Sequence, residues 1–189
     1  DTGAHFIEGS TDITRTFALG DLTEDEKKFY TLVLKGNLQL GNAQWKAGCT
    51  GANLDYLARE PLWRLEADYN HGTGHGVGYI LSVHEGPQSI HWGRGSATPL
   101  EGGMITSNEP GFYLEGAFGV RLENLTAVFY AFDIGIQVTD DGKPAAAKVG
   151  AGIRAKAQIF AAGPVFHIVP GVEALPGEIG NFILPVAPG

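Results

Sequence analysis

The 189-residue sequence contains one cysteine and no long apolar run. The lone cysteine, Cys49, excludes an internal disulfide framework and fits a reducing compartment. No segment approaches the roughly 20 apolar residues that a membrane-spanning helix needs, and the chain does not open like a signal peptide. We therefore expect a cytoplasmic protein that does not act at a membrane.

Basic residues are also scarce. The 13 lysines and arginines are outnumbered by 21 aspartates and glutamates, which gives a formal net charge of -8. Nucleic acids and anionic membranes are bound by clusters of basic residues, so this balance argues against both as partners. An oxygen-rich metal site would contribute to the acidic excess, and simple solubility explains it equally well.

The amino-terminal third predicts a hairpin followed by helices. Residues 1–6 and 13–19 are typical of two short strands, joined by a turn at residues 8–10. Thr23 precedes three acidic residues, which predicts the start of a helix with a hydroxyl cap and a favourable dipole interaction.

The interior of this first helix carries Gly36 and Asn37, which weaken it, the glycine by about 1 kcal/mol. Two further helices and then two strands with inward polar residues are expected at residues 52–59, 62–67, 104–106 and 119–123. Helices followed by a glycine-rich antiparallel region are typical of an α+β domain.

The composition changes near Ala127. Residues 128–138 predict a strand and residues 139–142 a turn. Alanine, glycine and proline then dominate, without a repeat or a helical period, so residues 128–189 are expected to be a poorly structured or foreign tail.

Two histidines lie among four glycines in residues 71–78 (HGTGHGVG). The glycines permit close backbone approach, as a ligand-lined cavity requires. The segment lacks the lysine of a phosphate-binding P-loop, so its histidines favour metal chemistry. Asp1 and Asp12 lie on the two arms of the predicted hairpin, where their carboxylates can face each other.

Together with two glutamates, these residues form a candidate ligand set: Asp1, Asp12, His75, Glu109 and Glu123. Four carboxylates and one imidazole suit Mn²⁺, and also Co²⁺, Fe²⁺ or Zn²⁺, better than copper or an iron–sulfur cluster. Without metal, the crowded carboxylates would repel one another. Two divalent ions and a bridging hydroxide bring the cluster to about −1, which a substrate's ammonium group can complement.

Several segments, taken in order, resemble the Xaa-Pro aminopeptidases (aminopeptidase P), which belong to the "pita-bread" metallopeptidases with methionine aminopeptidase and prolidase. They are residues 1–4 (DTGA), 11–16 (TDITRT), 71–78 (HGTGHGVG), 83–87 (VHEGP), 109–113 (EPGFY) and 119–124 (GVRLEN). The resemblance extends from Asp1 to about Ala127. It implies an α+β pita-bread fold, which we expect to be incomplete at both ends. Residues 1–127 would be part of the catalytic domain and residues 128–189 an unmatched tail.

The resemblance implies a role for each candidate ligand. Asp1 and Asp12 would bind one metal ion, with Asp12 bridging to the second. His75 and Glu109 would complete one coordination sphere, and Glu123 would also bridge. A hydroxide shared by the two ions would attack the carbonyl that precedes proline.

It also implies roles for three residues that do not bind metal. His84 would stabilise the tetrahedral intermediate or shuttle its proton, and with His71 it would bind substrate. His71 would flank the prolyl pocket. Arg121 would orient neighbouring carboxylates, although a plain structural salt bridge is equally consistent with its position. The remaining histidines, expected outside the site, are His5, His91 and His167.

The expected reaction is hydrolysis of the bond between an amino-terminal residue and proline, in a peptide with proline at its second position. The alternatives are a prolidase-like dipeptidase and an inactive, truncated pita-bread module retained for binding. All five ligands are present, which counts against the inactive module. A homodimer is left open. Missing portions of the fold would expose sheet edges, so we expect the isolated chain to be unstable or weakly active.

Overall fold

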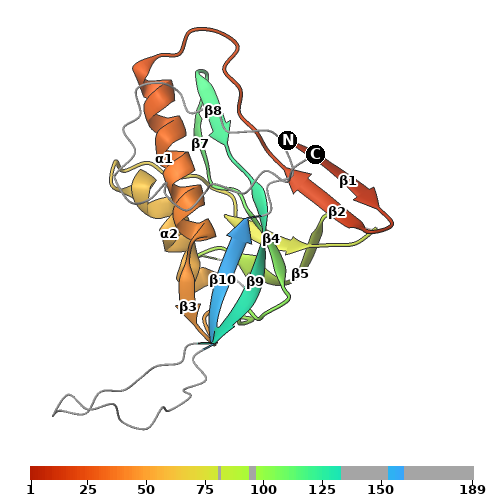
Figure 1. Cartoon of the computed structure of the whole chain (residues 1–189). Helices are drawn as coiled ribbons and strands as arrows, with labels where there is room; N and C mark the ends of the chain where they lie inside the picture. The colour runs from red at the N-terminus through yellow and green to blue at the C-terminus, as the bar shows by residue number, and fades with distance from the viewer. Residues whose placement is uncertain (81, 94–96, 133–152, 160–189) are drawn as a thin grey trace, which may run out of the picture.

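The computed structural model describes residues 1–80, 82–93, 97–132 and 153–159 (Figure 1). Its helices are α1 (Glu24–Gly41) and α2 (Gly51–Trp63). Its strands are β1 (Thr2–Phe6), β2 (Gly9–Ile13), β3 (Gln44–Lys46), β4 (Gly74–Val77), β5 (His84–Ile90), β6 (Ile105–Asn108), β7 (Gly111–Leu114), β8 (Phe118–Arg121), β9 (Asn124–Phe132) and β10 (Ile153–Ile159). The expected α+β class is confirmed.

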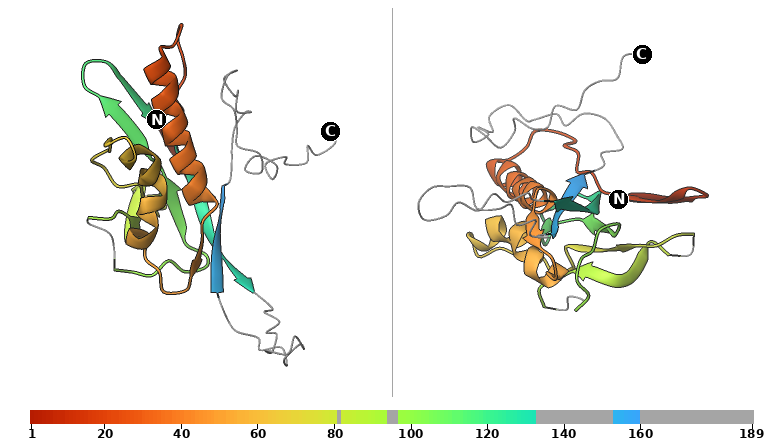
Figure 2. Two further views of the ribbon diagram at one scale, coloured as in Figure 1. Left: turned by 90° about the vertical axis from the view of Figure 1, so that its left-hand side faces the viewer. Right: turned by 60° about the horizontal axis from the view of Figure 1, so that its bottom comes forward.

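Six strands form one antiparallel sheet in the order β3-β10-β9-β6-β4-β5. The two helices lie side by side against one face of this sheet, as two further views show (Figure 2). The β7–β8 hairpin continues along α1, whereas the β1–β2 hairpin projects from the side away from the helices (Figures 1 and 2). In the part of the chain that is described, neither helix is long and apolar enough to cross a membrane.

The core consists of two apolar clusters. One lies between the helices and the six-stranded sheet and contains Leu40, Ala43, Trp45, Leu54, Ala58, Ile90, Leu100 and Val128. The other joins both helices to the β7–β8 hairpin and contains Val33, Leu62, Tyr69, Phe112, Val120 and Leu122. Phe29 of α1 stacks on Phe112 with 3.8 Å between ring centroids, so this hairpin is fixed to the helix layer.

Helix α1 begins as expected. The Thr23 hydroxyl accepts a hydrogen bond from the Glu26 amide at 3.2 Å, and the Glu26 carboxylate accepts one from the Thr23 amide at 2.7 Å. Gly36 does not interrupt the helix, because it serves a close contact: a Cβ there would lie 2.1 Å from the carbonyl oxygen of Ala58 in α2.

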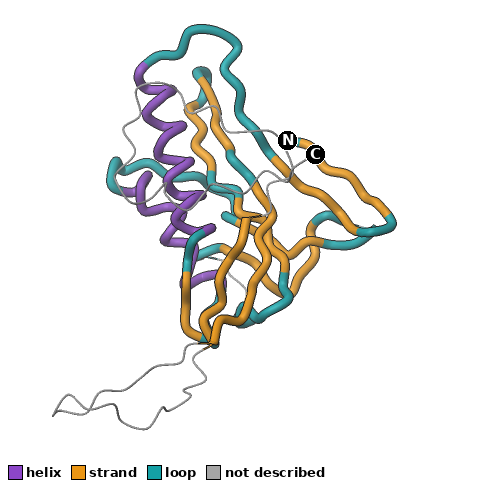
Figure 3. Tube along the Cα trace, viewed as in Figure 1, coloured by secondary structure: helices purple, strands orange, loops and turns teal. Residues whose placement is uncertain are grey.

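The amino-terminal hairpin is shifted relative to the prediction. Thr2 pairs with Ile13 and Phe6 with Gly9, so the second strand is β2 rather than residues 13–19, and the turn lies at residues 7–8. Residues 14–23 form the long loop that leads to α1 (Figure 3). The prediction was wrong because the polar groups at the start of this loop bond to residues 121–124 instead of continuing the hairpin.

The two predicted helices at residues 52–59 and 62–67 are one helix, α2, followed by a turn. Pro61 lies inside α2 although proline removes a helical hydrogen bond. Burial explains why the helix continues, since Ala58 and Leu62 on either side of Pro61 are fully buried. In the turn that follows Trp63, Glu66 adopts a φ of 55° and the Ala67 amide donates to the Leu62 carbonyl, which closes the end of the helix.

The carboxy-terminal part contains more strand than the sequence predicts. β9 begins at Asn124, so it spans the expected boundary at residue 127. β10, within the segment expected to lack structure, pairs with both β9 and β3. The predicted turn at residues 139–142, and the part of the predicted strand beyond residue 132, lie outside the described residues.

Candidate metal centre

Two carboxylates reach the site from the β1–β2 hairpin. Asp12 in β2 is paired with Gly3, and Asp1 lies two residues before Gly3 on the same strand face. The two aspartates are therefore diagonal neighbours across the hairpin, not directly opposite each other. Both line a cavity of about 490 Å³.

His75 in β4 directs its Nε2 atom towards two of the carboxylates. This atom lies 3.3 Å from Asp12 Oδ2 and 3.3 Å from Glu109 Oε1. The other ring nitrogen, Nδ1, is 2.9 Å from the carbonyl oxygen of Gly76. A hydrogen bond from Nδ1 to that carbonyl places the lone pair of a neutral imidazole on Nε2, where it can bind a cation.

The two glutamates lie just beyond the paired ends of β6 and β9. Ser107 donates a hydrogen bond to Glu109 at 2.9 Å, and Thr14 donates one to Glu123 at 2.5 Å. Glu123 is only 1% exposed. Burial raises the pKa of both glutamates, and the nearby Asp12 carboxylate adds to the effect.

The ligand atoms of these side chains lie close enough together to bind divalent cations. The ligand atoms of Asp12, His75 and Glu123 all lie within 4.8 Å of one another, and Glu109 adjoins His75. The donors are hard oxygens with one imidazole, a set that suits divalent cations, and burial is the main cause of the raised pKa of the two glutamates. The cavity is lined by Asp1, Asp12, His71, Gly72, Gly74, His75, His84, Glu109, Arg121 and Glu123.

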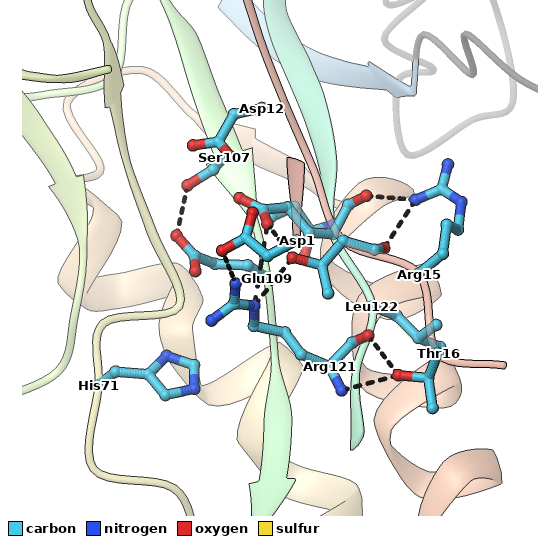
Figure 4. Close-up of polar contacts among 12 residues, drawn as sticks. Asp1, Asp12, Arg15, Thr16, His71, Ser107, Glu109, Arg121 and Leu122 are labelled. Carbon is cyan, nitrogen blue, oxygen red and sulfur yellow. Dashed lines mark hydrogen bonds and ion pairs between the residues drawn. The ribbon is translucent and has the colours of Figure 1, made fainter. Parts of the chain in front are cut away.

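Arg121 at the end of β8 pairs with Asp1. Its Nη2 donates to Asp1 Oδ2, and its Nε donates to the Thr14 hydroxyl at 3.0 Å (Figure 4). The same Nε lies 3.9 Å from Glu123 Oε2. Arg121 therefore contacts carboxylates from both the hairpin and the sheet.

The two predicted substrate-side histidines line the same cavity. The His84 ring stands nearly perpendicular to that of His75, with 4.3 Å between centroids. The Nε2 atom of His71 is 2.9 Å from the Tyr113 hydroxyl, and its Nδ1 is 2.8 Å from the Gly72 carbonyl. Burial, aided by the positive charge of Arg121, lowers the pKa of His71 and so favours the neutral ring.

Four supporting residues were not singled out from the sequence: Thr14, Arg15, Ser107 and Tyr113. Thr14 and Ser107 each lie two positions from a candidate ligand, so a period of two along a strand could have identified them. Arg15 donates to the Glu123 carbonyl at 2.6 Å and to the Asn124 side chain at 2.9 Å. No local signal indicates this contact, because its partners lie more than 100 residues away.

The other histidines lie elsewhere. His5 is on the exposed face of β1, where its Nδ1 is 2.6 Å from the Ser10 hydroxyl. His91 Nδ1 accepts a hydrogen bond from the Gly93 amide at 3.0 Å. Neither lines the cavity, and His167 lies outside the described residues.

Residues 1–130 match the model of metallopeptidase family M24. Aminopeptidase P2 of Arabidopsis thaliana is 52% identical over 128 residues, which are 68% of this chain and 18% of that protein. A probable Xaa-Pro aminopeptidase P of Botryotinia fuckeliana is 53% identical over 129 residues, 68% of this chain and 20% of that protein. The chain thus spans about a fifth of the length of these relatives.

Solved structures of pita-bread enzymes share the fold. An X-prolyl aminopeptidase from Caenorhabditis elegans, described as a cytosolic enzyme with a di-nuclear active site, matches with a TM-score of 0.69 and 35% identity. That match covers 83% of this chain and 23% of the other. A prolidase from Pyrococcus furiosus matches with a TM-score of 0.60 and 34% identity, over 67% of this chain and 36% of the other.

Proposed function

Because this chain belongs to metallopeptidase family M24, we propose that it carries the metal centre of an Xaa-Pro aminopeptidase. The observation that carries the proposal is the convergence of carboxylates from three strand regions and one imidazole on a single cavity. Relatives named aminopeptidase P and Xaa-Pro aminopeptidase, more than half identical over the matched residues, support this reaction type. The substrate would be a peptide with proline at its second position.

Two divalent ions would be held by the five candidate ligands Asp1, Asp12, His75, Glu109 and Glu123. The di-nuclear site described for the C. elegans enzyme supports the number of ions. The oxygen-rich donor set favours Mn²⁺, with Co²⁺, Zn²⁺ and Fe²⁺ as alternatives. When bound, the ions would supply a hydroxide nucleophile at neutral pH by lowering the pKa of water.

The chain's own residues would then bind and orient the peptide. The acidic cavity would attract the ammonium group of the first residue. His84, next to His75, would donate a proton to the oxygen of the scissile carbonyl or to the departing nitrogen. His71, neutral and fixed by Tyr113, would lie beside the prolyl ring, and Arg121 would hold the Asp1 carboxylate in place.

The proposal is tested by hydrolysis of an Xaa-Pro-Pro tripeptide by the purified chain, with and without added Mn²⁺. We expect metal-dependent release of the first residue, reduced about 100-fold or more by Glu109→Ala, because that change removes a ligand. Glu115→Ala is the matched control, since Glu115 is exposed in the turn after β7 and does not line the cavity.

Two other outcomes would change the assignment. Prolidases among the structural neighbours favour a dipeptidase as the second candidate, and cleavage of an Xaa-Pro dipeptide but not the tripeptide would establish it. Failure to cleave either peptide, with folding and metal binding intact, would identify an inactive module.

The proposed place of action is the cytoplasm. The C. elegans relative is described as cytosolic, which supports this location. Activity recovered in a membrane or secreted fraction of the source cells would contradict it.

A further inference from the structure

The two glutamates of the candidate metal centre occupy matching breaks in a strand ladder. β6 and β9 pair up to Asn108 and Asn124, and β7 and β8 pair from Gly111 and Arg121 onwards. Between these two ladders, residues 109–110 and 122–123 lie outside both registers and are joined by one long backbone hydrogen bond, from the Leu122 amide to the Pro110 carbonyl at 3.3 Å. The distance between Glu109 and Glu123 is therefore not set by the regular hydrogen bonds of either ladder.

A side chain from helix α1 spans this break. The Nδ2 atom of Asn37 donates hydrogen bonds to the carbonyl of Asn108 at 2.9 Å and to the carbonyl of Leu122 at 3.1 Å. Each of these carbonyls belongs to the peptide group that leads into a glutamate. Asn37 is only 2% exposed, and its backbone carbonyl accepts a hydrogen bond from the Asn108 side chain at 2.9 Å.

The geometry of the carboxamide makes this contact specific. Its two N–H groups lie in one plane at a fixed angle, so they hold the two carbonyl oxygens at a fixed separation. On the other side of the same peptide groups, the Glu109 amide donates to the backbone carbonyl of Thr73 at 2.8 Å. The Glu123 amide donates to the backbone carbonyl of Thr14 at 3.1 Å. The backbone at each glutamate is thus fixed from two directions.

Helix stability does not explain an asparagine at this position. Asparagine is less favourable in a helix interior than leucine, and it must be fully hydrogen-bonded when buried. The next turn of α1 contains Leu40, which is buried in an apolar cluster and needs no such contacts.

We propose that Asn37 is a positioning residue that sets the spacing between Glu109 and Glu123, so that both can share one pair of metal ions. The inference rests on the proposed metal centre. Asn37 does not line the cavity, and its side chain forms no hydrogen bond with any of the five candidate ligand side chains. Its effect on metal binding would pass through the backbone.

The test compares the native chain with a series that removes the two donors stepwise. Asn37→Ser leaves one hydroxyl donor, and Asn37→Leu leaves none at similar volume. Leu40→Ala is the matched control, because it creates a cavity in the same helix away from the two carbonyls. Circular dichroism establishes folding, calorimetric titration with Mn²⁺ gives stoichiometry and affinity, and electron paramagnetic resonance reports whether two bound ions are coupled.

We expect the native chain and Leu40→Ala to bind two Mn²⁺ ions with a spin-coupled spectrum. Asn37→Leu should bind the second ion about 10-fold or more weakly and show the six-line spectrum of isolated ions, with Asn37→Ser intermediate. If Asn37→Leu does not fold, the metal binding of Asn37→Ser tests the inference. Native stoichiometry, affinity and coupling in the folded Asn37 variants, or equal losses in Leu40→Ala, would overturn the inference. A native chain that binds no pair of ions would instead overturn the metal centre itself.

Discussion

At the scale of single residues, the candidate site contains several buried carboxyl groups and few positively charged groups. Glu123 is almost completely buried and receives a hydrogen bond from Thr14, yet burial still raises its pKa. The pKa of Glu109 is raised for the same main reason. In the metal-free chain burial shifts both carboxyl groups towards the protonated form, so protons and metal ions compete for the same positions.

This competition predicts the effect of Glu123→Gln. A carboxyl group whose pKa is raised by folding stabilises the protein below its unfolded pKa, and this contribution is lost as the pH rises through the folded value. The metal-free variant should therefore gain stability relative to the native chain as the pH is raised from 4 to 8. Thermal melts in a chelator measure the difference.

With saturating Mn²⁺ the native chain should be the more stable of the two at pH 8, because it keeps the full ligand set and gains more free energy from ion binding. Ligand at about 100 times its dissociation constant stabilises a fold by about 2.7 kcal/mol. A stability difference in chelator that does not change between pH 4 and 8 would show that the charge of Glu123 is already well compensated.

At the scale of elements, α1 and α2 depend on a close contact. A methyl group on Gly36 would overlap the carbonyl oxygen of Ala58 at 2.1 Å, and this backbone atom cannot move independently of α2. Gly36→Ala should therefore destabilise the chain by about 1–3 kcal/mol, although alanine favours a helix. Denaturant unfolding checks this, with Gly20→Ala as control, since nothing lies within 4 Å of a Cβ there. A stabilised Gly36→Ala variant would mean that the helices separate at no cost.

Helix α1 illustrates which features could be predicted from the sequence alone. Thr23 predicted the start of α1 correctly, because capping is a contact between neighbours in the chain. Gly36 and Asn37 were interpreted as weak points of the helix. In the structure Gly36 makes the close contact with Ala58 of α2, and Asn37 donates to the carbonyls of Asn108 and Leu122, 71 and 85 residues away. The candidate metal ligands were proposed from local motifs. The residues that fix the backbone at these ligands could not be proposed in the same way, because their contacts form only when distant segments pack together.

At the scale of the whole molecule, the main sheet depends on β10. This strand pairs with β9 over Ile153–Ile159 and with β3, so without it the edge of β9 would be unpaired and β3 would lose its partner among the described strands. A chain ending at residue 132 should melt at a lower temperature than the full chain and aggregate more readily. Differential scanning calorimetry and light scattering would measure both. Equal melting temperatures would show that β10 pairing does not contribute to stability in solution.

The projecting β1–β2 hairpin gives metal binding an entropic cost. Among the described strands, β1 and β2 pair only with each other, and β1 is exposed along its whole length. Asp1 and Asp12 therefore belong to a ribbon whose attachment depends on a few contacts, such as those of Arg121 and Thr14. An ion bound by carboxylates of both the β1–β2 ribbon and the main sheet would be chelated by two separately folded parts of the chain. Its affinity then depends on the effective concentration of the ribbon carboxylates at the sheet, so tightening the ribbon's attachment would strengthen ion binding without altering any ligand.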